Sequence, residues 1–245
     1  MARPAVQLYS LRRVDQPLET VVRRAGELGF DGVEFATRVG DADPDAVAAA
    51  LEETGLETVA AHVGFETLTA DLEATVGFYR DLGCDTLVVP YLDDAHFASR
   101  GAIEDTATEL VALAERCRDH GIRLCYHNHD HEFVTVDGAP AFVQLLEAAD
   151  DPLRFEVDLG WVTAAGYDPV ALLEAYHEQI PLVHVFDVAP ETGEPTNVGD
   201  GLLDVDACAR AVREHEIEWA IYEHDDPADP FGAAEHGATV LADFE

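Results

Sequence analysis

The sequence contains no lysine, because all 14 of its basic residues are arginine. This absence excludes mechanisms that need a lysine amine, namely a Schiff-base nucleophile, the lysine of a phosphate-binding loop and a lysine general base. Basic residues of any kind are few. The 14 arginines stand against 50 acidic residues, which gives a formal net charge of −36 at pH 7. Without a basic stripe to neutralise phosphates, binding to nucleic acid is not expected.

Cysteine and long apolar runs are also scarce. Cys84, Cys117, Cys125 and Cys208 show no CxxC spacing, which argues against a disulfide framework and against a zinc ribbon. We expect reduced, buried thiols. No stretch approaches the roughly 18 consecutive apolar residues of a membrane span, and the first residues do not form a secretory signal. We therefore expect a cytoplasmic protein with no membrane partner.

The negative charge has a physical consequence of its own. Like charges repel one another across a compact molecule in dilute buffer, whereas at about 1 M salt the Debye length falls to about 3 Å and the repulsion is screened. We therefore expect a high-salt cytoplasm and a stability that rises with salt.

With 48% hydrophobic residues among 245, the chain is still able to bury a large core in one domain.

Apolar runs of strand length alternate with helical patterns along the whole chain, and a glycine or an Asp-Pro pair marks most boundaries. The helical patterns include one unbroken helix at residues 68–82. Eight such units at a spacing of about 30 residues predict a single domain over residues 1–245, folded as a closed (β/α)₈ TIM barrel. An open, doubly wound sheet is disfavoured because no glycine-rich nucleotide fingerprint follows the first strand. The strands are expected at residues 5–10, 32–36, 56–63, 86–90, from 124, 153–158, 182–188 and 218–223.

Polar side chains gather where four of these strands end. The stretch LCYHNHDHEF (residues 124–133) delivers three histidines, an Asn, an Asp and a Glu within six residues, and Asp158, His184 and Glu223 each end one of the next three strands. Neighbouring barrel strands lie about 4.8 Å apart and end at one face, so these side chains are able to surround one ion. Two carboxylates and an imidazole suit a divalent metal that keeps open positions for substrate oxygens.

The fifth strand offers more than one further ligand. His127 would give a site of two imidazoles and two carboxylates, whereas Glu132, in the loop beyond the strand, would give three carboxylates and one imidazole. Both alternatives stay open, and Glu223 with Glu132 or His127 is the candidate pair of base and acid. The predicted set of metal ligands is Glu132, Asp158, His184 and Glu223.

Other residues at the strand ends are candidates for contacts with the substrate. Arg12 and His62 lie near the ends of the first and third strands, and Trp161 offers an apolar wall for a sugar ring. His129 shares a strand face with His127. Asp187, at the end of the seventh strand, completes the set.

Together the motifs resemble the sugar phosphate isomerase/epimerase family of xylose-isomerase-like TIM barrels. The resemblance implies a divalent metal (Mn, Mg, Co or Zn) held by a fifth-strand residue with Asp158, His184 and Glu223. Phe186 stands where relatives commonly carry a lysine, so a charged contact to a phosphorylated or acidic substrate is missing. The motifs that carry the resemblance are VQLYSLR (6–12), DGVEFA (31–36), AHVG (61–64), YHNHDHEF (126–133), DLGW (158–161), LVHVFD (182–187), VGDG (198–201) and EHD (223–225).

The expected chemistry is proton abstraction beside a carbonyl, because a metal that bridges two sugar oxygens stabilises the enediolate. We expect an isomerase or epimerase acting on a small sugar or sugar derivative, with a dehydratase of the inosose or dehydroshikimate type as the alternative enzyme. A non-catalytic sugar- or metal-binding barrel is the alternative from another class. A hydrolase of abasic-site DNA is disfavoured by the charge. A homo-oligomer is compatible with the apolar residues of the outer helices.

Overall fold

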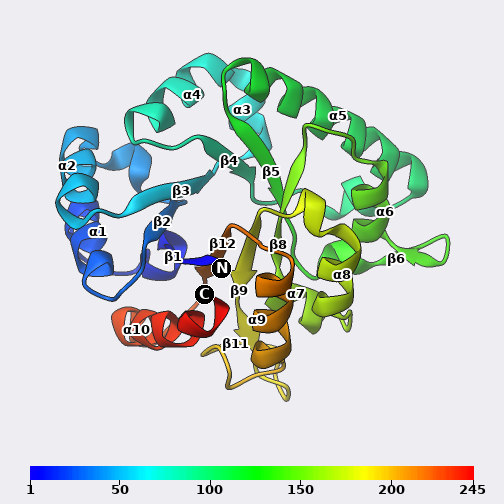
Figure 1. Ribbon diagram of the computed structural model, residues 1–245. Coiled ribbons are helices and arrows are strands. Elements are labelled where there is room, and N and C mark those ends of the chain that lie inside the picture. The colour runs from blue at the N-terminus through cyan, green and yellow to red at the C-terminus, as the bar shows by residue number, and fades with distance from the viewer.

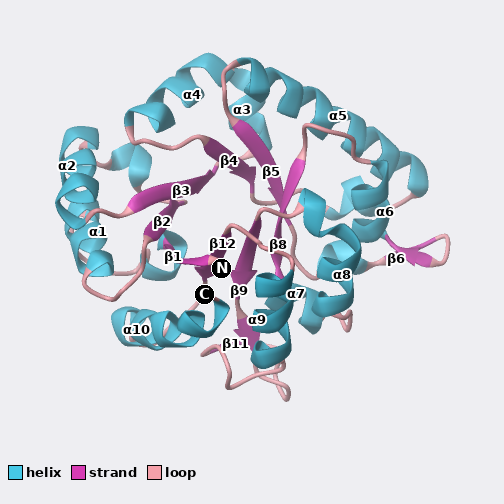
Figure 2. Ribbon diagram, in the orientation of Figure 1, coloured by secondary structure: helices cyan, strands magenta, loops and turns pink.

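The structure is a computed structural model that describes residues 1–245. Parallel strands close into a barrel in the order β1-β12-β9-β8-β5-β4-β3-β2, and helices surround it (Figures 1 and 2). The predicted (β/α)₈ barrel is therefore confirmed. Its strands are β1 (Arg3–Gln7), β2 (Gly32–Phe35), β3 (Glu57–His62), β4 (Thr86–Val89), β5 (Arg123–His127), β8 (Arg154–Asp158), β9 (Leu182–Val185) and β12 (Trp219–Tyr222).

Seven of the ten helices begin where a short polar side chain caps them. Asp43 accepts a hydrogen bond from the amide of Asp45, and Asp168 accepts from the amides of Val170 and Ala171. A proline follows each of these aspartates, as the sequence predicts. The helices are α1 (Leu18–Gly26), α2 (Pro44–Thr54), α3 (Phe65–Ala70), α4 (Leu72–Asp81), α5 (Arg100–Asp119), α6 (Ala141–Ala148), α7 (Leu159–Ala164), α8 (Pro169–Tyr176), α9 (Val205–Glu214) and α10 (Pro230–Leu241).

Local backbone geometry departs from expectation at three places. Residues 68–82 do not form one helix, because Asp71 is extended and its side chain caps α4 through the amide of Ala74. The first strand ends at Gln7 and continues as a 3₁₀ helix, Leu8–Leu11. The seventh strand ends at Val185, and β10 (Asp187–Val188) pairs instead with β11 (Pro195–Thr196). A second small hairpin joins β6 (Thr135–Val136) to β7 (Ala139–Pro140).

The interior of the barrel is filled in layers. One apolar cluster comprises Ala5, Val59, Ala60, Val88, Cys125, Leu182 and Ile221. Alternation along a strand places the residue two positions later on the same face. For Ala5, Ala60, Cys125 and Leu182 that later residue is polar: Gln7, His62, His127 and His184. A polar layer therefore lies directly above the apolar one, towards the C-terminal ends of the strands.

A larger apolar cluster of 65 buried residues packs the strands against the surrounding helices. None of the helices combines the length and the apolar character that a bilayer span requires.

Candidate active site

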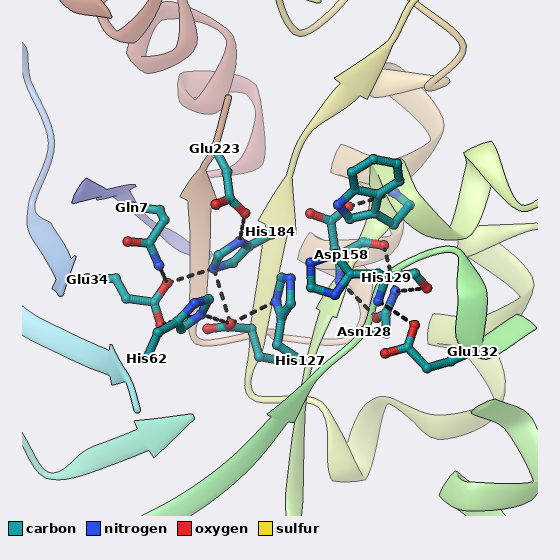
Figure 3. A network of polar contacts seen from close by, with 12 residues as sticks. Gln7, Glu34, His62, His127, Asn128, His129, Glu132, Asp158, His184 and Glu223 are labelled. Atoms are coloured by element: carbon teal, nitrogen blue, oxygen red, sulfur yellow. Dashed lines mark hydrogen bonds and ion pairs between the residues drawn. The ribbon is translucent and has the colours of Figure 1, made fainter. Parts of the chain in front are cut away.

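Four buried side chains gather at the C-terminal ends of adjacent strands. His127, Asp158 and His184 belong to β5, β8 and β9, and Glu223 follows β12. One ligand atom from each lies within 4.8 Å of one ligand atom of every other. Register explains part of the arrangement, since Asp158 pairs with His184 across the β8–β9 ladder. We call these four residues the upper group (Figure 3).

Asp158 has one oxygen that is engaged and one that is not. Its Oδ1 accepts a hydrogen bond of 2.7 Å from the amide of Trp161 and so caps α7. Its Oδ2 is buried and has no hydrogen-bond partner. Buried polar atoms normally have one. An unpartnered carboxylate oxygen beside a second carboxylate and two imidazoles fits a divalent cation.

Burial and neighbouring charge shift the pKa values of the two carboxyls of the upper group in opposite directions. Burial raises the pKa of Asp158 well above its ordinary value. Burial alone would also raise the pKa of Glu223, but the imidazole of His184, with Nδ1 2.7 Å away, outweighs it and lowers that pKa to about 2.

A second group of polar side chains, which we call the lower group, borders the upper group inside the barrel. It consists of Gln7, Glu34, His62 and Glu156, all inward-facing residues of the strands. The Nε2 of Gln7 donates to Glu34 Oε2 at 2.7 Å, and the Nε2 of His184 lies 2.7 Å from the same oxygen. His184 therefore reaches both groups, with Nδ1 towards Glu223 and Nε2 towards Glu34.

Burial and charge around the lower group also shift the pKa values of neighbouring side chains. Burial, reinforced by the charge of Glu156, raises the pKa of Glu34 to about 7. Burial lowers the pKa of His127 to about 4, so its imidazole is neutral near pH 7. The three histidines His62, His127 and His184 face one another with ring centroids 4.7–5.5 Å apart (Figure 3).

Glu132 does not join the upper group. Its Oε1 accepts a hydrogen bond of 2.7 Å from the hydroxyl of Tyr126, and its Oε2 accepts one of 2.7 Å from the amide of His129. Tyr126 precedes His127 on β5 and therefore faces the outside of the barrel. The short 3₁₀ turn at His131–Phe133 folds the Glu132 carboxylate back to that side (Figure 3). Of the two fifth-strand alternatives, the structure places His127 with Asp158, His184 and Glu223.

A cavity of about 570 Å³ opens above the upper group. Four of the five predicted substrate contacts line it, namely Arg12, His62, His129 and Trp161. Both guanidinium groups in the cavity have partners: Arg12 donates to the carbonyls of Tyr9 and Asp225, and Arg13 pairs with the carboxylate of Asp226. Trp161 packs against Phe186 at a centroid distance of 4.7 Å.

Asp187 lies elsewhere. Its carboxylate accepts hydrogen bonds of 3.0 Å from the amides of Gly199, Gly201 and Leu203, and it is not among the residues that line the cavity. A side chain on Gly201 would overlap this carboxylate, which explains the glycine. The structure therefore places Asp187 as an anchor of the VGDG loop rather than beside the substrate cavity.

A larger cavity, of about 700 Å³, lies at the opposite, N-terminal end of the barrel. Arg123 and Glu218 on its wall form an ion pair at 2.9 Å, and none of the unpartnered buried side-chain atoms belongs to its lining. The C-terminal end of the barrel is therefore the better candidate for an active site.

Sequence reasoning missed Gln7, Glu34 and Glu156 as members of the site. A signal was present in the sequence, because Glu34 and Glu156 are charged residues with apolar neighbours on both sides inside predicted strands. In the structure, residues 32–35 and 155–158 are all buried. Glu156 also precedes Asp158 by two positions and must share its face.

Comparisons with known proteins agree with this architecture. Inosose dehydratase from Geobacillus kaustophilus is 27% identical over 252 residues, which cover 86% of this chain and 81% of that protein. A sugar phosphate isomerase/epimerase from Parabacteroides distasonis superposes with a TM-score of 0.84 at 19% identity, over 98% of both chains. The probable 3-DHS dehydratase of petrobactin synthesis from Bacillus anthracis has a TM-score of 0.80 at 16% identity, over 99% of both chains. The sequence model of the xylose isomerase-like TIM barrel family matches residues 22–244, and the chain belongs to that family.

Proposed function

We propose that this protein is a divalent-metal-dependent enzyme that abstracts a proton beside a carbonyl of a small, sugar-like substrate. The observation that carries the proposal is the upper group, which lies at the floor of a cavity of about 570 Å³ and contains a buried, unpartnered oxygen of Asp158. A buried site with perturbed carboxyls and imidazoles beneath a cavity is typical of catalysis.

The residues that would hold the ion are His127, Asp158, His184 and Glu223, because they are the four that lie together. When bound, a divalent ion supplies Lewis-acid polarisation of the substrate's carbonyl and hydroxyl oxygens. Mixed imidazole and carboxylate ligands suit Mn, Co or Zn better than Mg.

Glu223 is the proposed base. It lines the cavity and is ionised near pH 7 because its pKa is lowered to about 2. His127 would serve as a ligand of the ion rather than as an acid, since burial lowers its pKa to about 4, and Glu132 is held away from the cavity by Tyr126 and the amide of His129. Proton return to the neighbouring carbon would make the protein an isomerase, and return to the opposite face would make it an epimerase.

The cavity favours an uncharged, polyhydroxylated substrate. Arg12 and Arg13 already have acceptors, and Asp225 and Asp226 add negative charge to the same wall. A phosphate or carboxylate would meet this charge without a free cation to bind it. Trp161 offers an apolar face on which the C–H side of a ring can pack.

A dehydratase is the second candidate, because the curated relative with 27% identity over 86% of this chain is named inosose dehydratase. Dehydration begins with the same proton abstraction and then loses a β-hydroxyl as water. A non-catalytic binder of sugar or metal would bind the substrate without either step.

Metal analysis and solvent exchange test the proposal together. Wild type, Asp158→Asn, Glu223→Gln and Glu132→Gln are purified in molar salt and incubated in D₂O with a panel of ketoses and cyclitol ketones. We expect near-stoichiometric metal in the wild type and in Glu132→Gln, loss of metal from the other two variants, and deuterium in one substrate.

The products separate the candidates. Deuterium without loss of water identifies an isomerase or epimerase, and loss of water identifies a dehydratase. Metal that remains bound both in Asp158→Asn and in Glu223→Gln would contradict the proposed ion site. Bound metal and bound sugar with no exchange would make the protein a binder.

A further inference from the structure

We propose that Glu156 is a positioning residue that orients the histidines of the ion site without itself binding the ion. The inference rests on the proposed function, since it concerns the same site. Glu156 lies on β8 two residues before Asp158, so its side chain enters the barrel on the same face but one layer lower. It is fully buried.

One oxygen of Glu156 is the common neighbour of three imidazoles. Its Oε2 lies 2.8 Å from His62 Nε2, 3.0 Å from His127 Nδ1 and 3.2 Å from His184 Nε2. A carboxylate only accepts hydrogen bonds, so each ring must direct an N–H towards it. One residue of β8 thereby determines which ring nitrogen carries the N–H in three histidines, which come from β3, β5 and β9.

The direction of these N–H groups determines which nitrogen of each ring is left to bind an ion. With its Nδ1 turned to Glu156, His127 keeps Nε2 as its lone-pair nitrogen. With its Nε2 turned to Glu34 and Glu156, His184 presents Nδ1 to the upper group, 2.7 Å from Glu223, where a bound ion would replace the proton that Nδ1 shares with this carboxylate. Metal-binding histidines commonly donate their second N–H to a carboxylate, which fixes the tautomer and the ring orientation.

A second ion in the lower layer is the competing explanation. His62, His127, Glu156 and His184 also offer ligand atoms within 4.8 Å of one another, and Oε1 of Glu156 has no hydrogen-bond partner. However, a neutral imidazole has only one lone-pair nitrogen. The Nε2 of His184 lies 2.7 Å from Glu34 Oε2 and 3.2 Å from Glu156 Oε2, so it directs an N–H to these carboxylates and offers no lone pair to a deeper ion. Hydrogen bonding therefore explains the lower layer better.

The test compares Glu156→Gln with Glu132→Gln. Both glutamates are fully buried near the C-terminal end of β5 and β8, but Glu132 makes no contact with His62, His127 or His184. Co²⁺ alone is titrated against a competing chelator in molar salt, its visible absorption is recorded, and the unfolding of the metal-free proteins by urea is measured. We expect Co²⁺ affinity to fall about 10–100-fold in Glu156→Gln, with an altered absorption spectrum, and to remain at the wild-type value in Glu132→Gln.

The other outcomes each decide the question. Unchanged Co²⁺ affinity in Glu156→Gln would overturn the inference, as would an equal loss in both variants. Two Co²⁺ ions per wild-type chain, one of them lost in Glu156→Gln, would make Glu156 a ligand and overturn it as well. If the Gln variant does not fold, Glu156→Asp keeps the charge but shortens the side chain: weaker binding supports the inference and unchanged binding overturns it. A wild type that binds no Co²⁺ refutes the proposed function itself, which is a separate result.

Discussion

The four cysteines illustrate how burial acts on single residues. All are free and buried, which confirms the expectation of reduced interior thiols. Burial raises the pKa of Cys84 and Cys208 to about 12 and that of Cys117 to about 11, and it also raises the pKa of Cys125 well above its ordinary value. The thiolate is the reactive form, so these cysteines should be inert in the folded protein.

We predict that a thiol reagent at pH 8 labels the native protein far more slowly than the urea-unfolded chain, in which four thiols react. The raised pKa values also predict a loss of stability in alkali. Above about pH 9 the unfolded chain releases thiol protons that the folded protein retains, so the free energy of unfolding falls as pH rises from about 9 towards 12. Native labelling as fast as that of free cysteine would contradict the buried arrangement.

At the scale of elements, the contact between α7 and the end of β9 depends on one glycine. Gly160, in the first turn of α7, lies so close to Phe186 that a Cβ atom would overlap the backbone carbonyl of Phe186. Asp158, which caps α7, belongs to the upper group, so this contact adjoins the candidate site. Gly77, inside α4, has no neighbour within 4 Å of the same hypothetical atom and is a matched control.

We predict that Gly160→Ala lowers the free energy of unfolding by about 1–3 kcal/mol, because a backbone carbonyl cannot move aside as a flexible side chain can. Gly77→Ala should raise it by about 0.5–1 kcal/mol, since alanine is the better helix former and meets no obstacle. Urea unfolding of both variants in the same salt provides the comparison. Equal effects of the two substitutions would show that α7 is free to shift away from β9.

At the scale of the whole molecule, the charge is too unbalanced for ion pairs to compensate. The 14 arginines are far fewer than the 50 acidic residues. Several of them, including Arg3, Arg23 and Arg123, already pair with exposed glutamates. Exposed pairs of this kind contribute little to stability. We therefore expect the stability of the fold to depend on dissolved ions that screen the repulsion among carboxylates.

We predict that the thermal unfolding midpoint rises between dilute buffer and 2 M KCl, and that NaCl acts alike because screening depends on ionic strength. Sucrose at matched osmolality is the control, since it favours the compact state without screening charge. A midpoint that is flat in KCl, or that rises equally in sucrose, would contradict electrostatic repulsion as the cause.

The sequence by itself determined the barrel and three of the four residues of the upper group. Alternating strand and helix patterns are local, and the Asp-Pro caps at residues 43–44 and 168–169 mark helix starts without tertiary information. Asp158, His184 and Glu223 were identifiable because each ends an apolar strand, and the C-terminal ends of parallel barrel strands meet at one face.

Only the tertiary structure shows that His127, and not Glu132, lies with Asp158, His184 and Glu223. The two differ in which side of β5 they reach, and Glu132 is drawn to the outer side by Tyr126, a contact that no spacing in the sequence reveals. Membership of Gln7, Glu34 and Glu156 in the polar layer was likewise decided by register between strands. Register depends on how separate strands pair across the barrel, so a single strand's pattern determines the face of a residue but not its neighbours.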